Sequence, residues 1–165
     1  MREKQLSLSE LASVLEEELS LYRKLCELSL RKRDAVVKDN VDLLAKIIGE
    51  ERMLIVEAER LEAKRIAEIA KLAQELGLEE NDIKLSDLKS FFKEEDFAPL
   101  EERAKQLKTV LDELKEINET NRYLIESTLK YISYLIDSLM NTLSRVTYTR
   151  GKPAGPNFSL FEKEA

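Results

Sequence analysis

Hydrophobic residues recur at intervals of three and four along most of this chain, which is the spacing of one face of an α-helix. Ser7 and Glu10 have the spacing of a capping box, so a first helix is predicted over residues 8–38. A second helix is predicted over residues 40–76, with Asp39 and Asp42 resembling its N-terminal cap. Its apolar line comprises Leu44, Ile47, Ile48, Leu54, Ile55, Ala58, Leu61, Ile66, Ile69, Leu72 and Leu76.

A connector is predicted after the second helix, at residues 77–98. Gly77 stands where a left-handed helix C-cap belongs. Ser86 is expected to cap a short helix over residues 86–92, whose aromatic residues Phe91 and Phe92 are expected to close one end of a bundle.

Pro99 is tolerated in the first turn of a helix, so a third long helix is predicted over residues 99–146. At about 1.5 Å per residue it spans about 70 Å, longer than either of the other two helices. Because short loops join antiparallel neighbours, the expected fold is all-α, an elongated antiparallel three-helix bundle or coiled coil. This bundle covers residues 1–146. Residues 147–165 contain two of the four glycines and two of the three prolines and are predicted to be a flexible tail.

Two asparagines interrupt the apolar seam predicted for the third helix. One line of the seam is Ala104, Leu111, Asn118, Ile125, Ile132, Leu139 and Val146, and the other is Leu100, Leu107, Leu114, Asn121, Thr128, Leu135 and Thr142. A buried amide without a partner costs about 1–3 kcal/mol. Either the asparagines fix the register of the helices, or this stretch lines a groove that awaits a partner.

The carboxyl-terminal half of the third helix is more apolar than one seam requires. Thirteen of the 24 residues from 123 to 146 are apolar or aromatic, and only four are charged. Apolar residues also flank the seam, with Leu124 and Tyr131 on one side and Leu129, Ile136 and Leu143 on the other. A helix that is apolar over most of its circumference is normally covered on several sides. A third element is therefore expected to cover Tyr134 and Met140: the tail, a second copy, or a client helix.

Composition and charge exclude several functions. The net charge of −6 disfavours nucleic-acid binding, and the absence of histidine removes the usual general base and metal ligand. Glycine-rich phosphate loops are absent, so neither an enzyme nor a bound cofactor or metal is expected. No signal peptide or membrane-spanning segment is apparent, and Cys26 is expected to be a core residue of a protein in the reducing cytoplasm.

The order of these elements resembles the FlgN family of flagellar type III export chaperones. The similarity covers roughly residues 8–151, and rests on the KDNVDLLAKI step into the second helix, the connector with its short helix, and the NETNRYLIESTLKYISYLIDSL stretch followed by TYTRG. The Phe158–Phe161 segment does not match the family pattern, and its role stays open.

The resemblance implies a cytoplasmic, non-enzymatic chaperone. Its expected partners are hook-associated proteins of the hook–filament junction, bound through their C-terminal helices, and the flagellar export gate or ATPase apparatus. Tyr148 is the candidate contact with the gate. The candidate partner-binding residues are Asn118, Asn121, Leu124, Ile125, Leu129, Tyr131, Tyr134, Ile136, Met140 and Leu143.

Two alternatives use the same apolar surface. A structural coiled-coil or adaptor protein would bury it in a homodimer. A membrane-surface helix would need a lysine-rich polar face, which this stretch lacks, so stable membrane insertion is not expected.

Overall fold

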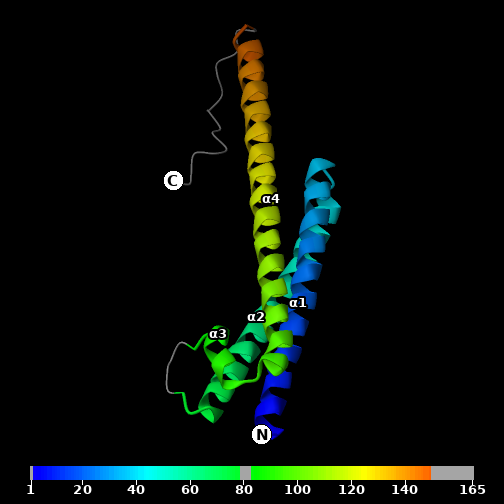
Figure 1. Cartoon of the computed structure of the whole chain (residues 1–165). Helices are drawn as coiled ribbons and strands as arrows, with labels where there is room; N and C mark the ends of the chain where they lie inside the picture. The colour runs from blue at the N-terminus through cyan, green and yellow to red at the C-terminus, as the bar shows by residue number, and fades with distance from the viewer. Residues whose placement is uncertain (1, 79–82, 150–165) are drawn as a thin grey trace. The chain divides into compact units, whose positions relative to one another are not determined.

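The structure, a computed structural model, describes residues 2–78 and 83–149, which form helices and no strand (Figure 1). Its elements are α1 (Arg2–Val37), α2 (Val41–Glu75), the single turn α3 (Leu85–Leu88), the 3-10 helix η1 (Lys89–Phe91) and α4 (Glu94–Thr149). The predicted all-α fold, with three long helices and a short connector helix, is confirmed. The chain divides into two compact units, Met1–Leu124 and Ile125–Ala165, and the boundary falls within α4.

The first helix begins earlier than predicted and does not use Ser7 as a cap. Ser7 is buried inside α1, and its hydroxyl lies 3.1 Å from both carboxylate oxygens of Glu75 on α2. A serine hydroxyl in a helix can bond to a neighbouring element instead of to its own backbone. The Ser7–Glu10 spacing therefore does not mark the helix start.

The turn between α1 and α2 is capped by Asn40 rather than by Asp39. The Asn40 side-chain oxygen accepts a hydrogen bond of 3.1 Å from the backbone N–H of Leu43. Asp39 takes a positive φ of 53°, a conformation that aspartate tolerates better than most residues. Asp42 lies in the first turn of α2, where its charge complements the helix dipole.

The end of α2 is as predicted, whereas the start of the short helix is not. Gly77 adopts a φ of 75°, and the N–H of Leu78 donates to the carbonyl of Ala73, a Schellman-type C-cap. The predicted cap at Ser86 is wrong, because α3 begins at Leu85. Its first turn is closed by Asp87, whose carboxylate accepts a 2.9 Å hydrogen bond from the backbone N–H of Lys84.

The third long helix starts five residues earlier than predicted, so Pro99 lies beyond its first turn. Phe97 explains the extension, because its side chain is buried and stacks on Phe92 with ring centroids 6.2 Å apart. Phe92 is half-buried against the core, as expected for a residue that closes the bundle. Phe91 is exposed instead, so the predicted closing role holds for one of the two aromatics.

The core of the Met1–Leu124 unit forms where α1 packs against α2 and against the first half of α4 (Figure 1). Its main cluster contains Leu8, Leu11, Leu15, Leu19, Cys26, Leu72, Leu88, Phe97, Leu100, Leu107, Val110 and Ile117. Cys26 is a core residue as predicted, and burial raises the pKa of its thiol, which keeps it protonated. Three residues of the apolar line predicted for the second helix, Ile48, Ile55 and Ile66, are exposed.

The carboxylate of Glu18 is buried between α1 and α2. Glu18 is 1% exposed, and its carboxylate lies 3.1 Å from Nε of Arg65. Burial is the main cause that raises the pKa of Glu18, and the nearby guanidinium of Arg65 opposes it. The pairing with Arg65 therefore offsets part of the cost of burying the Glu18 carboxylate.

Gly49 offers a direct test of helix propensity in α2. A Cβ at this position would meet nothing within 4 Å, so close packing does not require a glycine here. We expect Gly49→Ala to raise the free energy of unfolding by about 1 kcal/mol, because alanine loses less backbone entropy than glycine in a helix. Urea denaturation followed by circular dichroism measures this change. Lower stability of the variant would contradict it.

Candidate partner-binding surface

The side-chain amide of Asn121 has its hydrogen-bond partners inside the Met1–Leu124 unit. Its side chain is 2% exposed, and its amide nitrogen donates a 2.7 Å hydrogen bond to the carbonyl of Ser29 on α1. Its amide oxygen lies 3.4 Å from Nε of Arg33, also on α1. Asn121 therefore pairs α4 with α1 and is not exposed to a partner.

Asn118 belongs to the same group of polar contacts. The hydroxyl of Ser29 lies within hydrogen-bond distance of Asn118 Oδ1 (3.2 Å) and of Glu51 Oε1 (3.1 Å), and Lys32 pairs with Glu51 at 2.8 Å. These polar contacts join α1 to both α2 and α4. Because a shifted helix would leave buried polar groups unpaired, they fix the register of the three helices.

The predicted seam is right for one of its two lines, and only in the first half of α4. Leu100, Leu107 and Asn121 are buried, and Leu114 is half-buried. In the other line Leu111 and Asn118 are exposed, and Val110 and Ile117 are buried in their place. Val110 and Ile117 follow Leu107 and Leu114 by three residues, so these two lines form the buried face of the first half of α4.

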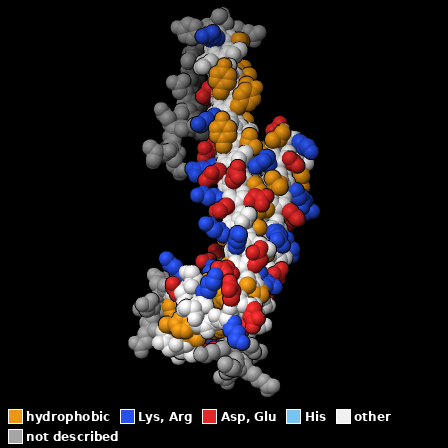
Figure 2. Space-filling model, viewed as in Figure 1, with side chains coloured by type: hydrophobic (Ala, Val, Ile, Leu, Met, Phe, Trp, Pro, Cys, Tyr) orange, Lys and Arg blue, Asp and Glu red, His pale blue; other side chains and the backbone are white. Residues whose placement is uncertain are grey.

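Every described side chain from residue 129 to residue 146 is exposed. Figure 2 shows hydrophobic side chains gathered along this part of α4. We call residues 129–146 the exposed stretch. Its large hydrophobic residues are Leu129, Tyr131, Ile132, Tyr134, Leu135, Ile136, Leu139, Met140, Leu143 and Val146. Leu124 and Ile125, just before it, are half-buried.

The exposed stretch contains four residues that were predicted as seam positions and are not among the candidate partner-binding residues. Ile132, Leu135, Leu139 and Val146 are 45–60% exposed. The apolar residues on most of the circumference of this part of the helix were the signal that could have identified them.

Helical periodicity separates Tyr134 from the other apolar residues of the exposed stretch. Successive residues turn by about 100°, so Tyr134 lies about 160° from Ile132 and close to Lys130 and Asn141. Most of the other apolar side chains fall within about 80° of Ile132, and Tyr131 lies about 100° from it on the remaining side. Tyr134 is exposed, but it stands on the polar face of the helix.

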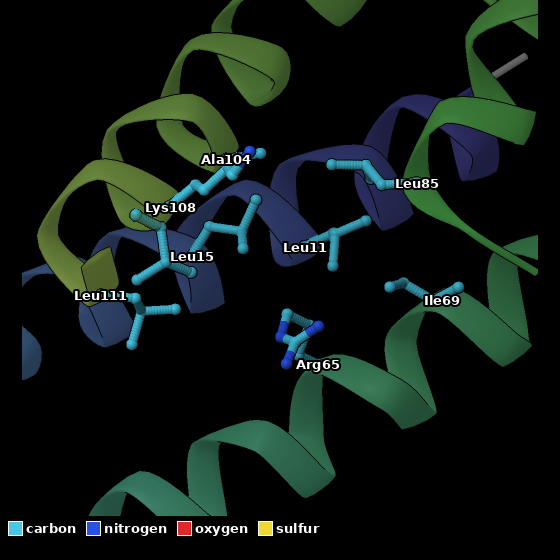
Figure 3. Close-up of a pocket in the computed structure, with 9 residues that line it drawn as sticks. Leu11, Leu15, Arg65, Ile69, Leu85, Ala104, Lys108 and Leu111 are labelled. Atoms are coloured by element: carbon cyan, nitrogen blue, oxygen red, sulfur yellow. The ribbon is translucent and has the colours of Figure 1, made fainter. Parts of the chain in front are cut away.

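A pocket of about 260 Å³ lies within the Met1–Leu124 unit and was not expected from the sequence (Figure 3). Its floor is formed by Leu11 and Leu15 of α1, and its walls include Ile69 of α2 and Leu111 of α4. The polar lining residues are Arg65 and Lys108, and Arg65 is paired with Glu18. Apart from these two side chains, the lining is apolar.

The described part of the chain also has no metal-binding cluster and no membrane-spanning helix. No group of three acidic, cysteine or histidine side chains there could hold a metal ion. None of the described helices is long and apolar enough to cross a bilayer. The side chain of Tyr148 and residues 150–165, including Phe158 and Phe161, lie outside the described part. Residues 147–149, predicted to be tail, belong to α4.

Comparison with known protein families gives one match that covers most of the chain. The family is described as FlgN protein, and the match extends over residues 1–154. No curated protein and no solved structure matches the chain.

Proposed function

The chain belongs to the FlgN family, which implies a non-enzymatic flagellar export chaperone, and we propose that it performs this role through the exposed stretch of α4. The proposed client is a hook-associated protein, bound through a C-terminal amphipathic helix before export from the cytoplasm. The observation that carries the proposal is the exposure of ten large hydrophobic residues within residues 129–146. A client helix laid on this surface would be shielded from premature assembly.

The apolar surface is large enough for the proposed binding. Full burial of one leucine or isoleucine side chain contributes about 1.5–3 kcal/mol, and several are available along the stretch. Association and the ordering of the client oppose this gain, which leaves a reversible complex. Release then needs a competing site rather than a covalent step. We propose the export gate as that site, with Tyr148 as the contact residue.

No described side chain of the exposed stretch is buried, so the stretch gains little of the packing that stabilises most protein helices. Isolated helices of fewer than about 12–15 residues are marginal in water, and longer ones still depend on buried contacts. We therefore expect backbone amides of residues 129–146 to exchange quickly in the chaperone alone and slowly when a client covers the stretch.

Sedimentation velocity and hydrogen exchange with a purified full-length hook-associated protein test the proposal. We expect a one-to-one complex in which exchange slows over residues 129–146, whereas protection around Leu11, Leu72 and Leu100 stays unchanged. A complex without slower exchange in the stretch would mean that the client binds elsewhere. A tight homodimer that ignores the client would favour the structural adaptor instead.

A further inference from the structure

The apolar arc on the exposed stretch is too wide for one partner helix. With Ile132 and Leu139 at its centre, the arc extends to Tyr131 on one edge and to Met140 on the other, about 180° apart. A helix that packs on a protein core has an apolar stripe of about 100° or more, and the seam between two helices of a coiled coil is narrower. One docked helix would therefore leave one edge of the arc in water.

Both edges and the centre of the arc are exposed in the described part of the chain. Tyr131 is 62% exposed and Met140 is 46% exposed, as are the central residues Ile132 and Leu139 at 45% and 60%. The polar face opposite the arc carries Lys130 and Asp137, which suits contact with solvent. A partner that covers the arc must therefore contact both of its edges. The polar face opposite the arc can stay in contact with water.

We propose that a single client supplies two helical segments, which complete a three-helix bundle with the exposed stretch. This inference rests on the proposed function and specifies the form of its client. The 18 residues from 129 to 146 extend about 27 Å, so each client segment needs about five turns of helix. Each segment packs along one edge of the arc, and the two meet over its centre, as in a three-stranded coiled coil.

Matched variants at the two edges test this arrangement. Tyr131→Ser and Met140→Ser alter opposite edges, Leu139→Ser alters the centre, and Tyr134→Ser alters the polar face. Tyr131 and Tyr134 are the same residue type with similar exposure, 62% and 66%, which makes them a matched pair. Isothermal titration with a full-length hook-associated protein measures the affinity, and circular dichroism checks that each variant is folded.

We expect both edge variants and the centre variant to weaken binding about tenfold, and Tyr134→Ser to change it less than twofold. Loss of affinity at one edge alone, or at the centre alone, would mean that a single helix docks and would overturn the inference while the proposed function stands. Unchanged affinity in all four variants would mean that the client does not bind the exposed stretch, which overturns the inference and the proposed site together. A trimer of the isolated chain in sedimentation equilibrium would show that other copies of the chain cover the arc, which also overturns the inference.

Discussion

Replacing Leu139 by aspartate is expected to abolish client binding, with a loss of at least about a hundredfold in affinity. Leu139 lies at the centre of the apolar arc and is 60% exposed, so its substitution removes no contact from the core of the protein. In the complex the aspartate would be a buried, unpaired charge, which costs several kcal/mol beyond the lost burial of leucine. A factor of one hundred requires only about 2.7 kcal/mol.

Asn141→Asp is the matched control for this substitution. It adds the same charge two residues away, on the polar face of the exposed part of α4. Both variants place aspartate inside a helix, so any general effect of helix propensity or net charge is shared. Titration calorimetry should show near wild-type affinity for Asn141→Asp. Equal loss in the two variants would mean that charge, rather than position on the arc, determines binding.

The largest expected effect on stability comes from Arg65→Ala. Without the guanidinium, the carboxylate of Glu18 is left buried with no cation, and breaking such a pair costs about 3–5 kcal/mol. Lys64→Ala is the control, because Lys64 pairs with Glu17 across the same two helices at 3.7 Å and both side chains are 45% exposed. An exposed pair of this kind contributes at most about 1 kcal/mol. Urea denaturation of both variants at pH 7 measures the difference.

The pH dependence of Arg65→Ala identifies the cause of its instability. The folded-state pKa of Glu18 is already raised by burial, and removal of Arg65 removes the main interaction that lowers it. Because the folded form then binds a proton more readily than the unfolded chain, stability increases as the pH falls toward this raised pKa. We expect the deficit of Arg65→Ala to shrink between pH 7 and pH 5. A deficit that does not change with pH would point to lost packing by the Arg65 side chain instead.

Adding Glu18→Gln to Arg65→Ala should recover most of the lost stability. Glutamine keeps the shape of glutamate and removes the buried charge, so no uncompensated ion remains. No recovery in the double variant would contradict the role assigned to Glu18.

The sequence predicted the fold because most of its core contacts follow one helical face. Leu8, Leu11, Leu15 and Leu19 recur at helical spacing, and all four are buried. Gly77 marked the end of α2, because few other residues accept a positive φ. The start of α4 was less predictable, since the burial of Phe97 depends on Phe92 and on the core around it rather than on a local capping signal.

The partner-binding surface stays a prediction. Leu129, Tyr131, Ile136, Met140 and Leu143 were assigned to it and are exposed, whereas for Asn121 the sequence left open a role in helix register and a role in a groove. An asparagine within an apolar line gives the same sequence pattern whether it fixes the helix register or lines a groove. The carbonyl of Ser29, 92 residues away, decides between them by accepting its amide hydrogen bond.

The sequence alone determined that three long helices form and where the most apolar part of the last one lies, because periodicity and composition are local properties. Only the tertiary structure decided which apolar residues are buried. Val110 and Ile117 are covered, and Leu111 and Leu139 are not, although all four fit an apolar face. Burial depends on which neighbouring helix reaches a given turn, and that depends on packing between residues distant in the chain.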